Sequence, residues 1–183
     1  MKEPQVARES GVRALNAVRE SLPRNPLQTK RSGKKSSRLY PELRARDIVD
    51  THNTFEGGGS LTVLAERTNE GLASKENMEV YRKEKAMSTF LAKDGHNVVL
   101  RQDNKKGETY DISIDGRPAD LKWVTSPKYM LGHAKKATTK QGAEMTVFML
   151  DGKWRKFRET IHTLSQKGYH GYYIKKSGEV RSY

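Results

Sequence analysis

The segment YDISIDGRPADLKWV, residues 110–124, contains the strongest local hairpin signal in this chain. In its first third, apolar residues alternate with Asp111 and Ser113, which predicts a strand with the two polar residues on one face. Asp115-Gly116 follows and is a strong signal for a tight hairpin turn. Beyond the turn, the alternation over residues 119–124 places Asp120 and Lys122 on one face of a second strand. The stretch therefore predicts an antiparallel ribbon that carries two acids and a lysine.

Upstream of this ribbon, the sequence predicts a helix that begins after Ser74 and ends at Asp94-Gly95, because serine caps helix N-termini and glycine favours their ends. A strand over residues 96–100 and a polar loop over 102–109 then lead into the ribbon. The apolar face expected for the helix consists of Val80, Ala86, Met87, Phe90 and Leu91.

Downstream of the ribbon, the pattern predicts a helix over residues 132–143, a buried strand over 145–150, a helix over 154–167 and a hairpin around 176–178. This order of elements predicts an α+β fold, in which helices pack on a small mixed or antiparallel sheet. We expect residues 74–183 to form this domain.

The first 73 residues are predicted to be a helical and flexible basic arm, because prolines interrupt them and a basic, serine-rich stretch covers residues 30–38. A short helix is expected over 41–49 and a flexible joint over 53–60. The joint contains three consecutive glycines but lacks the Lys-Ser/Thr that follows a phosphate-binding loop, so we exclude nucleotide binding there. The arm is either a solvated linker or a segment that binds phosphate groups or a carrier protein.

The 183 residues have a formal net charge of +13, and such an excess of cations favours nucleic acid as the partner. The chain has no cysteine, which excludes disulfides, thiol catalysis and cysteine-bound zinc. The sequence contains no apolar run near the roughly 20 residues of a membrane helix and no signal-like N-terminus. We therefore expect no membrane partner, and a chain that acts in the cytoplasm or is delivered to a target cytoplasm.

The acids and the lysine of the ribbon form a D-x8-D-x-K pattern made by Asp111, Asp120 and Lys122. Two carboxylates can hold Mg²⁺ beside a phosphate, and a lysine can stabilise developing negative charge or position water. The alternative is that both aspartates face solvent and Lys122 forms a weak surface pair with one of them.

The predicted helix after the ribbon carries a second group of polar residues. RNA cleavage without a metal needs a base for the 2′-hydroxyl, a cation for the phosphorane and an acid for the leaving oxygen. We assign His133 to proton transfer, Gln141 to the catalytic cleft, and the remaining residues to phosphate binding: Lys135, Lys136, Thr139 and Lys140.

The segments FLAKDGHNVVL, GETYDISIDGRPADLKWVTSP, HAKKATTKQGAEMTVFML and GYHGYYIKKSGEV together resemble the C-terminal nuclease domains of bacterial polymorphic toxins. They are most similar to the tRNA-cleaving domains of contact-dependent growth inhibition proteins, which also occur in phage and mobile-element proteins. The resemblance covers about residues 75–183. It implies a barnase, EndoU, colicin and RelE type of ribonuclease that needs no cofactor and is held inactive by an immunity protein.

The same residues also resemble the PD-(D/E)XK nucleases, in which Glu79, Asp111 and Asp120 would bind Mg²⁺ and Lys122 would act beside them. The sequence departs from that pattern because Tyr110 stands where a proline precedes the first aspartate. We favour an endoribonuclease that works by acid-base chemistry, because His133 and the lysines around it suit proton transfer. The alternatives are a metal-dependent DNA nuclease and a non-catalytic nucleic-acid-binding or phage structural protein.

Overall fold

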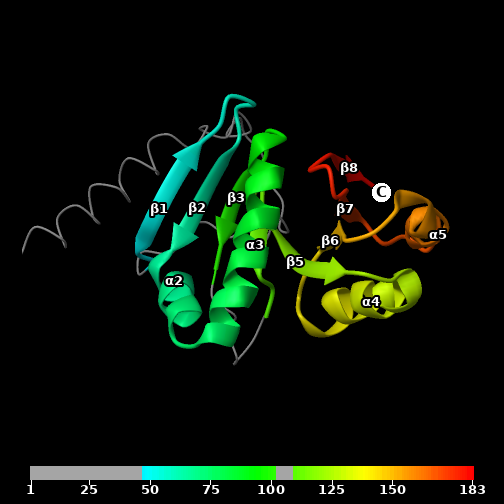
Figure 1. Cartoon of the computed structure of the whole chain (residues 1–183), viewed down its shortest axis with the longest axis horizontal. Helices are drawn as coiled ribbons and strands as arrows, with labels where there is room; N and C mark the ends of the chain where they lie inside the picture. Colours follow the sequence, from blue (N-terminus) through cyan, green and yellow to red (C-terminus); the bar gives the residue numbers. More distant parts are fainter. Residues whose placement is uncertain (1–46, 102–108) are drawn as a thin grey trace, which may run out of the picture.

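The computed structural model describes residues 47–101 and 109–183 (Figure 1). These residues form one mixed sheet with helices packed on it, so the predicted α+β class is confirmed. No helix in these two ranges is long and apolar enough to cross a membrane. The strands are β1 (Val49–Thr54), β2 (Ser60–Leu64), β3 (Asn97–Leu100), β4 (Ile112–Ile114), β5 (Arg117–Val124), β6 (Met145–Leu150), β7 (Gly171–Ile174) and β8 (Val180–Ser182); the helices are α2 (Ala65–Leu72), α3 (Lys75–Lys93), α4 (Met130–Lys140) and α5 (Arg158–Gln166).

The strands lie side by side in the order in which they occur in the sequence. Neighbours joined by tight turns are antiparallel, as in β1–β2, β4–β5 and β7–β8. The pairs β2–β3, β5–β6 and β6–β7 are parallel, and each is joined by a crossover that contains a helix, as parallel pairing requires. Figure 1 shows that the sheet turns strongly between β1–β3 and the strands after β5.

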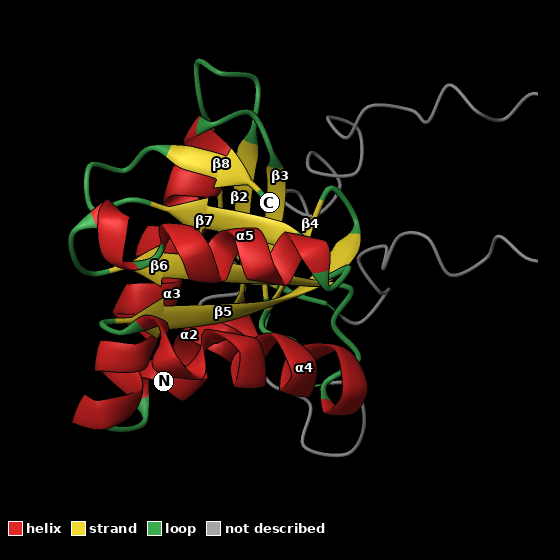
Figure 2. Cartoon of the chain, turned by 90° about the vertical axis from the view of Figure 1, so that its right-hand side faces the viewer, coloured by secondary structure: helices red, strands yellow, loops and turns green. Residues whose placement is uncertain are grey.

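Strand β6 is buried on both sides because helices cover both faces of the sheet. Met145, Val147 and Met149 pack in the cluster that includes α3 residues, whereas Phe148 and Leu150 pack in the cluster with α4 and α5. Alternate residues of a strand point to opposite faces, so α3 lies on one face and α4 with α5 on the other. Figure 2 shows α5 crossing in front of β6 and β7.

Several local predictions are confirmed. Ser74 caps α3, since its hydroxyl accepts a hydrogen bond from the Asn77 amide at 3.1 Å. Asp115 and Gly116 form the β4–β5 turn with positive φ angles of 49° and 81°, and the predicted closing hairpin joins β7 to β8. Val80, in contrast, is 50% exposed, so its assignment to the apolar face of α3 is wrong.

Two other predicted helices differ in their limits. The helix expected over 132–143 begins two residues earlier and ends at Lys140, because Gly142 takes a positive φ of 70° there. The helix expected over 154–167 is divided into a 3-10 turn, Trp154–Lys156, and α5.

The predicted division between an arm and a domain at residue 73 cuts through one sheet, because β1, β2 and α2 precede it. The glycines taken for a flexible joint form the β1–β2 turn, where the Phe55 amide donates to the Gly59 carbonyl at 2.9 Å. A Cβ on Gly59 would lie 2.2 Å from the Ala92 carbonyl oxygen, so glycine is needed for this turn to pack against the end of α3. The basic stretch 30–38, most of the short helix expected over 41–49, and most of the polar loop 102–109 lie outside the described residues.

Candidate active site

The candidate site lies where β4 stops and β5 continues. Pairing between these strands ends at Ile112 and Ala119, although β5 runs on beside β6 to Val124. Asp111, just before β4, still accepts a hydrogen bond from the Arg101 amide on its main-chain oxygen at 3.1 Å. Its carboxylate Oδ2 accepts the Leu121 amide of β5 at 2.8 Å. The Asp111 carboxylate thus supplies the hydrogen-bond acceptor that a longer β4 would have offered to the Leu121 amide.

Asp120 is the residue opposite Asp111 when the β4–β5 register is extended by one position. Its side chain is 0% exposed, and Lys122 Nζ lies 2.6 Å from its Oδ2. This contact is an ion pair without hydrogen-bond alignment, because neither carboxylate oxygen of Asp120 accepts a hydrogen bond from the described residues. The structure therefore brings together the three residues of the D-x8-D-x-K pattern, and the alternative of two solvent-facing aspartates does not hold for Asp120.

The electrostatics of the site are dominated by buried negative charge. Burial, followed by the charges of Asp120 and Glu84, raises the pKa of Asp111 to about 8, although Lys122 and the Leu121 amide act in the other direction. Like charges that share a buried site cannot all ionise without a compensating cation or proton. The site is therefore suited to hold one or the other at neutral pH.

A third carboxylate near the pair is Glu84 of α3, which the sequence analysis did not identify. Burial raises the pKa of Glu84, and the charge of Lys122 opposes this shift. The predicted residue, Glu79, has a side chain that is 71% exposed and pairs with Lys83 at 2.8 Å. Five positions along a helix amount to about 140° around it, so the two glutamates point in different directions.

The burial pattern of α3 contains a signal for Glu84. It precedes the buried residues Met87, Ser88 and Leu91 by three, four and seven positions, a spacing that places all four on one helix face. A glutamate on the buried face of a helix that packs beside the acidic ribbon is a candidate for the same site.

Glu84 and Asp111 line one half-open cavity of about 170 Å³. Arg67 of α2 and Arg101, which follows β3, also contribute to its wall. The cavity thus opens beside the acidic pair and contains both carboxylates and guanidinium groups.

His133 of α4 lies within electrostatic reach of Lys122 and Asp120. Burial lowers its pKa below 6.5, and the charge of Lys122 lowers it further, whereas that of Asp120 opposes the shift. The imidazole is therefore neutral at pH 7. Gln141 ends α4, where its main-chain oxygen accepts the Thr109 amide at 3.0 Å; its side-chain Oε1 is buried and has no hydrogen-bond partner among the described residues. No contact between Gln141 and the acidic pair is found in the part of the chain that the structure describes.

The residues expected to bind phosphate lie on the outer face of α4. The lysines at 135, 136 and 140 are exposed, and the charge of Lys136 reaches His133. Thr139 differs from them, because its hydroxyl donates to the Lys135 carbonyl at 2.7 Å within the helix. The lysines are thus available to an anionic partner, whereas the Thr139 hydroxyl is engaged.

The residues present are compatible with Mg²⁺. Among residues 47–101 and 109–183, no three acidic or histidine side chains gather closely enough to hold a metal ion by themselves. Mg²⁺, however, is usually bound by one or two carboxylates together with water and substrate phosphate oxygens. Asp111 and Asp120 supply two carboxylates, and the oxygens of Asp120 are buried without a hydrogen bond. The donor set fits this mode of binding.

The chain matches no family profile, and no curated protein matches it in sequence. Among solved structures, it is similar to a chain of the CdiA-CT/CdiI toxin and immunity complex from Burkholderia pseudomallei. The two chains are 16% identical with a TM-score of 0.49, and the similarity covers 61% of this chain and 89% of the other. A likeness of this size assigns neither a family nor an activity.

Proposed function

We propose that this domain is a nuclease that hydrolyses phosphodiester bonds with the help of a divalent cation at Asp111 and Asp120. The observation that carries the proposal is the fully buried Asp120 carboxylate, which accepts no hydrogen bond, faces a second aspartate and is paired with a lysine. Placing an ionised carboxylate in a protein interior is costly unless it serves as a ligand or is well paired. The cavity beside the pair gives room for a phosphate group.

The side chains have distinct roles in this proposal. Asp111 and Asp120 hold the cation, which when bound would polarise the phosphate and lower the pKa of an attacking water. Lys122, held next to Asp120, stabilises the negative charge that develops on the phosphoryl oxygens. Glu84 borders the same cavity and accepts a hydrogen bond from the attacking water.

RNA is the substrate we favour. The net charge of +13 and the exposed lysines of α4 suit any nucleic acid. His133, whose pKa is lowered by burial and by the charge of Lys122, supports a second candidate mechanism. In this mechanism RNA is cleaved without a metal, and His133 is the base that takes the proton of the 2′-hydroxyl. Only RNA carries this hydroxyl, so His133 favours RNA as the substrate. Both candidates place the scissile phosphate next to Lys122.

The decisive experiment incubates the purified full chain with tRNA and with plasmid DNA, each in Mg²⁺ and in EDTA. We expect cleavage of RNA in Mg²⁺, its loss in EDTA, and a decrease of about 100-fold or more in Lys122→Met and Asp120→Asn. Glu79→Gln is the matched control, because among the described residues this exposed carboxylate forms an ion pair only with Lys83, and it should cleave at the wild-type rate.

Each other result has a defined meaning. Cleavage of RNA that survives EDTA and requires His133 would replace the metal-assisted reaction with the acid-base ribonuclease. Cleavage of plasmid DNA alone would reassign the substrate. Binding without cleavage under all conditions would refute the nuclease and leave a nucleic-acid-binding protein.

A role as a toxin with an immunity partner is part of the proposal and rests on the sequence resemblance described above. Induced expression in a bacterial host should arrest growth, and Asp120→Asn should relieve the arrest. Normal growth with active soluble nuclease in the cells would contradict the toxin role.

A further inference from the structure

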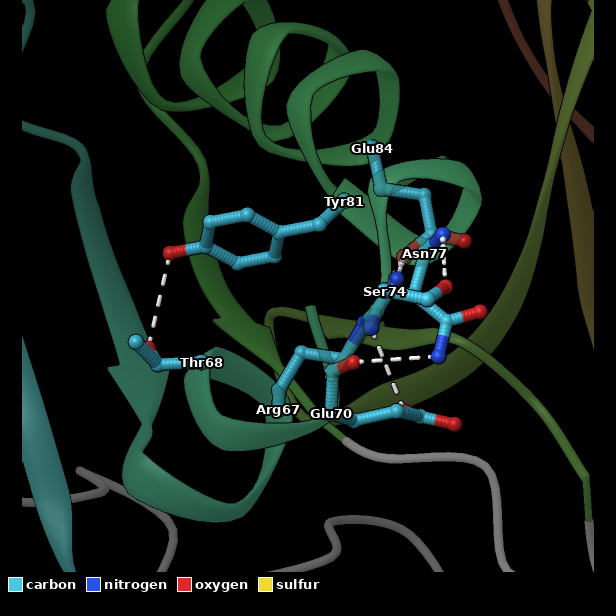
Figure 3. Close-up of polar contacts among 7 residues, drawn as sticks. All are labelled: Arg67, Thr68, Glu70, Ser74, Asn77, Tyr81 and Glu84. Atoms are coloured by element: carbon cyan, nitrogen blue, oxygen red, sulfur yellow. Dashed lines mark hydrogen bonds and ion pairs between the residues drawn. The ribbon is translucent and has the colours of Figure 1, made fainter. Parts of the chain in front are cut away.

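Arg67 of α2 forms a buried ion pair with Glu84 near the candidate site. It is 5% exposed, and its Nε and Nη2 donate to the same oxygen of Glu84, Oε2, at 3.0 and 2.7 Å (Figure 3). Within the described residues, the other oxygen of Glu84, Oε1, accepts no hydrogen bond. One side of the carboxylate is thus fixed while the other remains available.

The guanidinium itself is held from two more directions. Its Nη1 donates to Glu70 Oε2 at 3.2 Å, and it lies 5.4 Å from the centre of the Tyr81 ring. Tyr81 can approach α2 because Gly71 has no side chain; a Cβ there would lie 2.8 Å from the tyrosine Cγ. Arg67 therefore has one position, set by both helices.

The connection between α2 and α3 is also fixed by hydrogen bonds. Asn77 donates from its side chain to the Glu70 carbonyl at 3.1 Å, and its amide donates to the Ser74 hydroxyl (Figure 3). These hydrogen bonds tie the end of α2 to the start of α3, the two helices that carry Arg67 and Glu84.

Stability alone does not account for such a pair. The desolvation of two buried charges commonly cancels their attraction, and apolar residues of similar volume often replace buried ion pairs without loss. The pair also lies in a specific place: Arg67, Glu84 and Asp111 line the same cavity. The Arg67–Glu84 pair is therefore better explained by its effect on Glu84, whose carboxylate it holds in one orientation beside Asp111.

We propose that Arg67 is a positioning residue of the nuclease centre, which holds Glu84 so that Oε1 faces the cavity next to Asp111. The inference rests on the proposed function. In this arrangement, Glu84 would orient a water molecule in the cavity beside Asp111, and Arg67 would set the direction of the Glu84 carboxylate. The unit formed by β1, β2 and α2 is then part of the active enzyme, because it carries the residue that aligns Glu84.

The test compares Arg67→Met and Arg67→Lys with the wild-type full chain in two measurements: Mn²⁺ binding by calorimetry, and the kinetics of RNA cleavage. Loss of a group that orients a metal-site residue typically weakens metal binding or activity about 10–100-fold. We expect losses of that size in Mn²⁺ affinity and in kcat for Arg67→Met, with KM for RNA changed by less than about twofold, and smaller losses for Arg67→Lys. Lys83→Met, which removes the exposed pair of the same helix, is the matched control and should match wild type.

A double variant separates positioning from folding. Arg67→Met leaves the Glu84 charge buried without its partner, so circular dichroism must show that the variant is folded. In Arg67→Met/Glu84→Gln no such charge remains, and its Mn²⁺ affinity and kcat should equal those of Glu84→Gln alone. A double variant with clearly lower values would show that Arg67 acts by another route and would overturn the inference.

The outcomes distinguish this inference from the proposed function. Wild-type Mn²⁺ affinity and kcat in folded Arg67→Met would refute the inference and leave the nuclease intact. Arg67-dependent Mn²⁺ binding without cleavage of any nucleic acid would refute the nuclease and keep the positioning role at a metal site. Absence of both Mn²⁺ binding and cleavage in the wild type would overturn both.

Discussion

Replacing Asp111 with asparagine should change how stability depends on pH. The pKa of Asp111 is about 8 in the folded chain and 3.8 without the fold, so between these values the native state keeps a proton that the unfolded state has lost. The free energy of unfolding therefore falls as pH rises through this window, and the slope for one proton is about 1.4 kcal/mol per pH unit. From pH 5 to pH 7 the ceiling is roughly 3 kcal/mol. Because solvent reaches the cavity at Asp111 and screens its charge, we expect no more than about half of this ceiling.

The assay is urea denaturation of wild type and Asp111→Asn at pH 5, 6 and 7 in EDTA. Asparagine can still accept the Leu121 amide through its side-chain oxygen, so the variant loses the titration but keeps the contact. The stability of Asp111→Asn relative to wild type should increase steadily with pH. Excess Mg²⁺ should flatten the wild-type slope, because a bound cation favours the ionised carboxylate. Parallel curves in EDTA would show that Asp111 does not keep a proton in the folded state that it loses in the unfolded chain.

Three further outcomes are expected. Lys135→Glu with Lys136→Glu should weaken RNA binding and reduce the slope of log affinity against log salt by about 2, measured by fluorescence anisotropy; an unchanged slope would remove α4 from the binding surface. Thr139→Ala should leave RNA affinity unchanged, since its hydroxyl is engaged within the helix, and a clear loss would contradict that geometry. Asp115→Asn should cost about 1 kcal/mol at pH 5.5 and little at pH 8.5. The Asp115 carboxylate accepts a hydrogen bond from His96 Nδ1 at 2.7 Å, which raises the pKa of His96, and this contribution is lost as pH rises through that pKa. Equal losses of stability at both pH values, measured by thermal denaturation, would contradict the prediction for Asp115→Asn.

The candidate site could be predicted in part from the sequence. Asp111, Asp120 and Lys122 were found because a tight turn and strand alternation are local properties that fix which residues of a hairpin lie together. Glu84 was missed because the choice among the three glutamates of α3 depends on which face of the helix meets the sheet. Arg67 was missed for a stronger reason: its partner is 17 positions away, and only the packing of α2 against α3 brings them into contact.

The features with short-range causes can be read from the chain without its fold: the Ser74 cap, the Asp115-Gly116 turn, and the mostly apolar strand Met145–Leu150. Long-range packing was needed to show that β1 and β2 belong to the same sheet, because β2 pairs in parallel with β3 only after the chain crosses over through α2 and α3. It also decided that Asp120 is buried: alternation assigns a residue to a face, but only the helices packed on that face remove it from water.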